Sequence, residues 1–227
     1  MAGRQTGVCE TGEIEGRGAM QVLLIDGHPG SARLTSHLLD VYASALPPGC
    51  TITRIAVRDL VFDPVLHDGY AKRQAWEPDV RRVAEALLAA DHLVIAFPMW
   101  WGAEPAPLSG LLSRVLLPGF AFAYHPKDPW WDRLLTGRSA DLIVTMDTPP
   151  IWLWFAFGNA LLRRWRGQIL QFVGLKPVRT FALGPVKQGG VEKNLGKWEA
   201  RLAKAARSAA GLKRVEKAMP PLPGERT

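Results

Sequence analysis

The sequence has little cysteine and lacks the short motifs that mark common hydrolase and metal sites. Only Cys9 and Cys50 occur among its 227 residues, too few for a disulfide framework or a thiolate metal site. It contains no G-x-S-x-G turn and no HExxH pair, and its five histidines are scattered. We therefore predict neither a serine hydrolase nor a metal site. The low cysteine content favours the reducing cytoplasm as the location.

Long apolar runs and nucleic-acid motifs are also missing. The most apolar stretch, residues 151–162, ends at Arg163, Arg164 and Arg166, short of the ~20 residues that cross a bilayer. The N-terminal segment has no apolar signal core, so export is not predicted. The formal net charge of +7 suits an ordinary basic surface, or attraction of nucleotide phosphates or acidic membranes. Without a Lys/Arg-rich run, a nucleic-acid partner is not expected.

What is present is an alternation of strand and helix signals. Apolar or β-branched runs predict strands at residues 21–26, 51–57, 92–97, 141–146 and 178–183. Amphipathic or Ala-rich stretches predict helices at residues 34–46, 77–88, 108–117, 152–173 and 191–210. This alternation predicts an α/β three-layer sandwich with a five-stranded parallel sheet and helices on both faces. The strand count is that of the flavodoxin-like order 2-1-3-4-5.

The two ends of the chain have a different composition. Residues 1–19 are glycine-rich without periodicity, and we predict a disordered leader. Residues 20–212 form the predicted domain. Residues 213–227 contain three prolines and are predicted to be a flexible tail.

Two loops of the predicted sheet meet at its switch point, where such folds bind ligands outside the carboxyl ends of the strands. The first, residues 27–35, reads GHPGSARLT. Its backbone amides and the following helix can cradle a phosphate, with Ser31 and Thr35 as hydroxyl donors and His28 and Arg33 as sources of charge. Neither a GxGxxG nor a Walker lysine is present. The alternative is a capped turn that binds nothing.

The second loop, residues 98–106, begins with the unusual pair Trp100 and Trp101 followed by Gly102. Such a loop suits a flat, partly apolar ligand such as an isoalloxazine ring, whose nitrogens would accept hydrogen bonds from backbone amides near Gly102. An aromatic corner of the core or a dimer contact is the alternative.

A third stretch, TMDTPP, follows the fourth strand. Thr145 and Thr148 could hydrogen-bond the polar edge of such a ring while Asp147 positions the loop; a plain Asp-capped turn is the alternative. Trp152 and Phe155 come next and would cover a flat substrate, form a subunit contact, or belong to the core.

Taken together, GHPGS, FDPVLHDGY, FPMWWGAEPAPLSGLLSRVLLPGFAF and MDTPP resemble the flavodoxin-like NAD(P)H:quinone oxidoreductases over about residues 20–210. The resemblance implies a bound flavin (FMN or FAD), a homodimer with sites at the subunit interface, and two-electron, ping-pong transfer from NAD(P)H to a quinone or similar flat acceptor. By position it assigns flavin contacts to His28, Arg33, Leu34, Thr35, Pro98, Met99, Trp100, Trp101, Gly102, Thr145, Asp147 and Thr148.

The chain departs from that family at three places. Arg33 stands where a phosphate-binding serine is usual, and Ser109 where lysine is frequent. The Tyr/His pair of well-studied members has no counterpart in residues 147–157, so we expect the proton to come from solvent.

Two other functions agree with the same signals. A non-enzymatic, flavodoxin-type electron carrier is one, although such carriers are usually acidic and shorter than this chain. A regulatory flavoprotein subunit of a membrane transporter is the other, since the aromatic and basic residues 151–166 could contact a membrane or a transporter. Oxidation of NAD(P)H by a soluble quinone and recovery with membranes would separate these functions.

Overall fold

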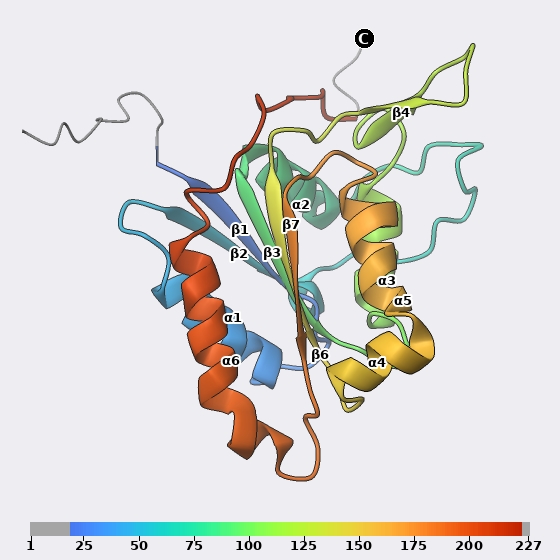
Figure 1. The fold of residues 1–227 in the computed structure, drawn as a ribbon. Helices are drawn as coiled ribbons and strands as arrows, with labels where there is room; N and C mark the ends of the chain where they lie inside the picture. The colour runs from blue at the N-terminus through green and yellow to red at the C-terminus, as the bar shows by residue number, and fades with distance from the viewer. Residues whose placement is uncertain (1–18, 224–227) are drawn as a thin grey trace, which may run out of the picture.

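The computed structural model describes residues 19–223, which form an α/β sandwich (Figure 1). The predicted leader lies almost entirely outside the described residues. The main sheet contains β1 (Gln21–Asp26), β2 (Thr51–Ala56), β3 (His92–Pro98), β6 (Ser139–Thr145) and β7 (Val178–Leu183). The helices are α1 (Leu34–Ser44), α2 (Pro78–Ala89), α3 (Ala106–Val115), α4 (Pro150–Phe157), α5 (Ala160–Arg163) and α6 (Gly190–Arg207), with a 3₁₀ turn η1 (Val57–Asp59) and a π-helical segment η2 (Arg164–Leu170).

The five main strands are parallel and lie in the order β2-β1-β3-β6-β7. In chain order this is 2-1-3-4-5, so the predicted flavodoxin-like fold is confirmed. Helices α1 and α6 cover one face, and α2, α3 and the α5–η2 segment cover the other (Figure 1).

Alternation along β1 explains how the sheet supports both helical layers. Val22 and Leu24 pack with α1 and α6, whereas Leu23 and Ile25 pack with α2 and α3. Successive strand residues point to opposite faces, so a strand that is apolar at every position can bury both sides. This is the pattern expected of a parallel sheet covered by helices on both faces.

Two connections differ from the sequence-based prediction. The helix predicted at residues 152–173 is three segments, because Gly158 and Asn159 both adopt left-handed backbone angles (φ +56° and +54°) and end α4. The long connection at residues 118–140 contains an antiparallel hairpin of β4 (Phe122–Tyr124) and β5 (Trp131–Arg133). Its strands are three residues long, too short to leave a clear period in the sequence.

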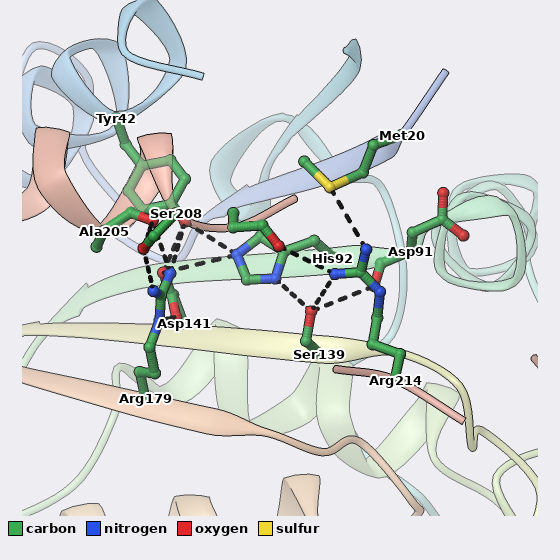
Figure 2. A network of polar contacts seen from close by, with 11 residues as sticks. Met20, Tyr42, Asp91, His92, Ser139, Asp141, Arg179, Ala205, Ser208 and Arg214 are labelled. Carbon is green, nitrogen blue, oxygen red and sulfur yellow. Dashed lines mark hydrogen bonds and ion pairs between the residues drawn. The ribbon is translucent and has the colours of Figure 1, made fainter. Parts of the chain in front are cut away.

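A buried polar network joins the helical layer to the sheet at the amino ends of β3 and β6 (Figure 2). The His92 ring lies 2.9 Å from the Tyr42 hydroxyl and 2.8 Å from the Ser139 hydroxyl. Tyr42 donates to Asp141 at 2.6 Å, and Arg179 donates to the same carboxylate. Burial and the nearby Asp141 raise the pKa of Tyr42, so its hydroxyl stays protonated. This network is at the opposite end of the strands from the loops predicted to bind a ligand.

Part of the predicted tail contacts the same end of the sheet. The Lys217 ammonium lies 2.8 Å from the Asp91 carboxylate. The buried Arg138 guanidinium donates to the carbonyl oxygens of Leu88 and Ala218. The division into leader, domain and tail stays a prediction.

Candidate functional site

The loops that leave the carboxyl ends of β1, β3 and β6 meet, as the fold class requires. The His28 ring contacts the edge of Trp100, with ring centroids 5.5 Å apart at 82°, which joins the first loop to the second. The Met99 amide donates to the carbonyl oxygen of Thr145 at 2.8 Å, which joins the second loop to β6. Residues predicted on three separate segments therefore form one region.

An ion pair lies beneath the first loop. Asp26, the last residue of β1, is fully buried, and its carboxylate lies 2.7 Å from the guanidinium of Arg58 in η1, the turn that follows β2. The hydroxyls of Ser36 and Thr35 donate to it at 2.6 and 3.2 Å. Burial alone would raise the pKa of Asp26, but the hydrogen bonds from Arg58, Ser36 and the His28 amide hold it below its ordinary value. The carboxylate is therefore ionised and neutralised by Arg58.

The first loop itself offers donors to an anion. No side chain among the described residues caps α1, so the first amides of this helix are free to bind a negative group. Arg33, just before α1, is exposed, and its guanidinium lies close to Gly30. Because Asp26 is already paired with Arg58, Arg33 leaves the loop with a net positive charge.

His28 completes the loop as a neutral donor. Its Nδ1 accepts a hydrogen bond from the Gly30 amide at 2.8 Å. Burial lowers the pKa of His28, against the opposing effect of Asp26, and the nearby Arg33 lowers it further. The neutral ring with Nδ1 as acceptor must carry its proton on Nε2, which leaves that nitrogen available as a donor.

The tryptophan loop is a tight two-residue turn. Trp100 and Ala103 exchange both backbone hydrogen bonds at 2.9 Å, while Trp101 and Gly102 have φ of +52° and +77°. This is the pattern of a type I′ turn. A bulky residue in the left-handed region is strained by about 1–2 kcal/mol. The turn leaves the Trp101 side chain fully exposed.

Strained backbone is concentrated at this end of the sheet. The non-glycine residues with positive φ in the described chain are Ala32, Trp101, Asn159 and Gln188. They lie in the connections that follow β1, β3, β6 and β7, respectively. Such strain persists only where the surrounding structure enforces it, and it is typical of ligand-binding regions. Ala32 and Trp101 lie in the two loops predicted from the sequence, whereas Asn159 and Gln188 lie outside those motifs.

Glu104 anchors the tryptophan loop and was not predicted from the sequence. Its buried carboxylate accepts hydrogen bonds from the Arg164 guanidinium at 2.6 and 3.1 Å and from the Trp165 indole at 3.0 Å. Burial favours a raised pKa for Glu104, but these donors lower it below its ordinary value. The loop is thereby fixed to η2 by an ionised group that is already paired, so Glu104 is a positioning residue.

An open groove of about 620 Å³ lies beside this loop. It is lined by Gly102, Phe157, Gly158, Ala160, Leu161, Arg163, Arg164 and Gln168. Phe157 faces the groove, whereas Trp152 and Phe155, predicted as the substrate wall, are exposed on α4 and do not line it.

The remaining predicted site residues differ in how accessible they are. Ser31 is exposed, whereas Thr35 is buried and its hydroxyl is engaged by Asp26. Leu34 packs against the α1–α6 side of the core. Asp147 is exposed and lies 2.8 Å from the Lys187 ammonium.

Pro98, Met99 and Thr148 are half-buried at the rim, and Thr145 is buried in β6. The assignment of all these residues to a bound cofactor stays a prediction. Within residues 19–223, no group of three or more His, Cys, Asp or Glu side chains could hold a metal ion.

Two observations indicate that the region could hold a flavin. The uncapped amides of α1 suit a phosphate, as does the exposed Arg33, which forms no ion pair within residues 19–223. The turn exposes the indole of Trp101 and the backbone of Gly102, which has no side chain, so a flat ring could pack against it. His28 connects the two parts through its contact with Trp100.

Comparison with known proteins gives the same class of fold. The profile of the family described as "Flavodoxin-like fold" matches residues 20–206, so the chain belongs to that family.

Among its relatives is an FMN-dependent NADH:quinone oxidoreductase 2 of Pseudomonas fluorescens, 32% identical over 192 residues, with 78% of this chain and 92% of the relative covered. An FMN-dependent NADH:quinone oxidoreductase of Cereibacter sphaeroides is 29% identical over 187 residues, covering 78% and 91%.

Solved structures agree on the fold. The NAD(P)H:quinone oxidoreductase of Methanothermobacter marburgensis superimposes with a TM-score of 0.69 at 22% identity, covering 84% of this chain and 96% of that one. The resemblance to NAD(P)H:quinone oxidoreductases expected from the sequence motifs is confirmed.

Proposed function

We propose that the protein is an FMN-dependent NAD(P)H oxidoreductase that reduces a quinone or a similar flat acceptor by two electrons. The observation that carries this proposal is the joining of the anion-binding first loop to the tryptophan turn through the contact of His28 with Trp100. Two relatives that span most of the chain are named for the same chemistry. FMN is favoured over FAD because both relatives are FMN-dependent by name.

The chain's own residues would bind and orient the reactants. Arg33, His28 and the first amides of α1 would hold the phosphate, and the turn at Trp101 and Gly102 would place the ring at the groove. A bound flavin supplies two-electron hydride chemistry, so no acid–base pair of the protein is required for the electron transfer. NAD(P)H and the acceptor would occupy the groove beside Gly102 in turn, which gives ping-pong kinetics.

The groups near the groove favour solvent as the proton source. The Glu104 carboxylate is ionised and held by Arg164 and Trp165, so it has no proton to give. His28 is neutral with its Nε2–H as its only donor, and giving up that proton from the neutral ring would be unfavourable. The pH dependence of quinone reduction should therefore show no step attributable to a carboxyl group.

We further propose a homodimer and a cytoplasmic location. A second copy would fit a groove of about 310 Å³ between α3 and η2, whose lining includes Leu112, Leu116, Ile169 and Phe172. This groove adjoins the groove beside Gly102, because Arg164 and Gln168 line the two of them. Light scattering of the purified protein would give the mass: twice that of the chain supports the dimer, and the mass of one chain contradicts it.

The function is tested by binding and turnover. The purified protein should bind FMN with a change in its visible spectrum and should oxidise NAD(P)H only when a soluble quinone is present. Flavin binding without NAD(P)H oxidation would favour the electron carrier, and recovery only in complex with a transporter would favour the regulatory subunit.

A further inference from the structure

Helix α4 lies at the carboxyl end of the sheet (Figure 1). It carries a dense group of exposed apolar side chains. At 3.6 residues per turn, Ile151, Trp152, Trp154 and Phe155 occupy an arc of about 160° centred between Ile151 and Phe155, which are 77% and 78% exposed. Leu153 points the other way and is buried in the core. Soluble monomers rarely expose a contiguous apolar face of this kind, so this face has a partner.

The segment that carries this helix is free of acidic residues. Between Asp147 and Glu192 the sequence has no Asp or Glu, but it has Arg163, Arg164, Arg166, Lys176, Arg179 and Lys187. Arg163 and Arg166 are exposed and form no ion pair with any described residue. The apolar face of α4 is therefore followed by uncompensated positive charge, on a chain whose net charge is +7.

This charge pattern selects among the partners that could cover α4. The dimer proposed above uses the groove between α3 and η2. In a symmetric dimer formed through α4 instead, the same patch would meet itself, and the exposed Arg163 and Arg166 of two copies would gather at one interface with no carboxylate of this segment to pair with them. An anionic bilayer instead supplies counter-charges in excess, worth about 1 kcal/mol for each basic residue near the surface. Tryptophan is also suited to the boundary between headgroups and acyl chains, because its ring is apolar while its N–H needs a polar partner.

We propose that α4 docks on an anionic phospholipid bilayer, with its aromatic side chains in the headgroup region, and that the acceptor is a lipid-soluble quinone drawn from that bilayer. The second part rests on the proposed function. Phe157, at the end of α4, lines the same groove as Gly102, so docking holds the groove at the membrane surface. NAD(P)H gives up one hydride, which carries two electrons and one proton, and becomes NAD(P)⁺. A second proton comes from solvent, and the quinone becomes a quinol.

The docking is tested without nucleotide or quinone, by flotation of the full chain with phosphatidylcholine vesicles prepared with and without phosphatidylglycerol. The test variant is Ile151→Ser/Trp154→Ser. The control is Trp130→Ser, because Trp130 is 66% exposed, close to the 64% of Trp154. It lies between β4 and β5, in a hairpin at the end of the sheet opposite α4 (Figure 1).

The wild-type protein and the control should float with phosphatidylglycerol-containing vesicles and much less with pure phosphatidylcholine, and added salt should weaken the binding. The double variant should bind at least about tenfold more weakly, because it removes two inserted apolar side chains. Equal flotation of the double variant, or no flotation of the wild type, would overturn the proposal. A fall in molecular mass of the double variant in vesicle-free light scattering would also overturn it and would assign the face to a second copy.

Activity then separates this inference from the proposed function. With a water-soluble quinone the double variant should match the wild type, and with a long-tailed quinone in anionic vesicles it should be at least about tenfold slower, in line with its weaker docking. Equal rates with the vesicle-borne quinone would refute the assignment of the acceptor. Absence of FMN binding or of soluble-quinone activity in the wild type would instead contradict the proposed function. The flotation experiment would still decide whether α4 docks on a bilayer, because it uses neither nucleotide nor quinone.

Discussion

Replacing Arg58 with Gln should destabilise the protein in a way that depends on pH. The change leaves the buried Asp26 carboxylate without its cation at 2.7 Å, with only Ser36, Thr35 and the His28 amide as donors. Removing one partner of a buried ion pair costs about 3–5 kcal/mol. Because the Arg58 side chain is 21% exposed, we expect the low end, about 3 kcal/mol at pH 7.5.

The sign of the pH effect follows from the pKa of Asp26. In the wild type this pKa lies below its ordinary value, so the stability it contributes is present above that value and is lost only as the pH falls through the lower, folded-state pKa. In Arg58→Gln, burial is no longer offset by the guanidinium and the pKa rises. The variant's deficit should therefore grow as the pH rises through the new pKa and shrink on acidification, by up to about 1.4 kcal/mol per pH unit.

Urea denaturation of both proteins at pH 7.5 and 4.5 measures this difference. The matched control is Arg82→Gln, which breaks the exposed pair of Arg82 with Asp79 on α2 and should change stability little at either pH. A deficit of Arg58→Gln that stays constant or grows at pH 4.5 would refute the assignment of Asp26 as an ionised, Arg58-dependent group.

Three further outcomes follow from other parts of the structure. Gly110→Ala should cost about 1–3 kcal/mol in urea denaturation because the added methyl overlaps Pro64, whereas Gly196→Ala, with open space around it in α6, should stabilise by about 0.5–1 kcal/mol; equal effects would contradict this packing. Tyr42→Phe should lose about 1–3 kcal/mol because the hydroxyl joins a buried histidine to a buried carboxylate, and an unchanged midpoint would contradict it. Arg33→Gln should weaken FMN binding about tenfold in fluorescence titration and leave riboflavin binding unchanged; equal losses would show that this residue does not contact phosphate.

The fold could be predicted because it depends on local signals. Continuous apolar strands such as β3 and β6, separated by helix-length segments, leave few topologies other than a doubly wound parallel sheet. The same rule placed the loops after β1 and β3 together, and their meeting through His28 and Trp100 is the outcome it predicts. Both the sheet order and the location of the candidate site therefore follow from strand spacing.

The polar contacts that shape the site could not be predicted in the same way. Asp26 and Arg58 are 32 residues apart, and Glu104 and Arg164 are 60 apart. No periodicity links such pairs, because they are set by the register of neighbouring elements. A bulky residue such as Trp101 in a left-handed turn is likewise unexpected, because a large side chain favours backbone angles with negative φ.

One missed feature did have a signal. Gly158 and Asn159 follow the apolar run of α4, and glycine or, less often, asparagine in the left-handed region commonly ends a helix. Reading that pair would have divided the predicted helix at residues 152–173 and separated the exposed α4 from the segment that lines the groove. The exposure of Trp152 and Phe155 on α4, and the position of Phe157 beside the groove, would then have been easier to anticipate.

The central claim, that the loops after β1 and β3 hold a flavin mononucleotide, is tested most directly by the flavin that the purified protein binds. The protein is saturated with an equimolar mixture of FMN and FAD, freed of unbound flavin and denatured, and the released flavin is identified by mass. We predict FMN at one molecule per chain, and its loss when Arg33 and Trp101 are replaced together by Gln and Ala. Release of FAD, or of no flavin at all from the wild-type protein, would contradict the account.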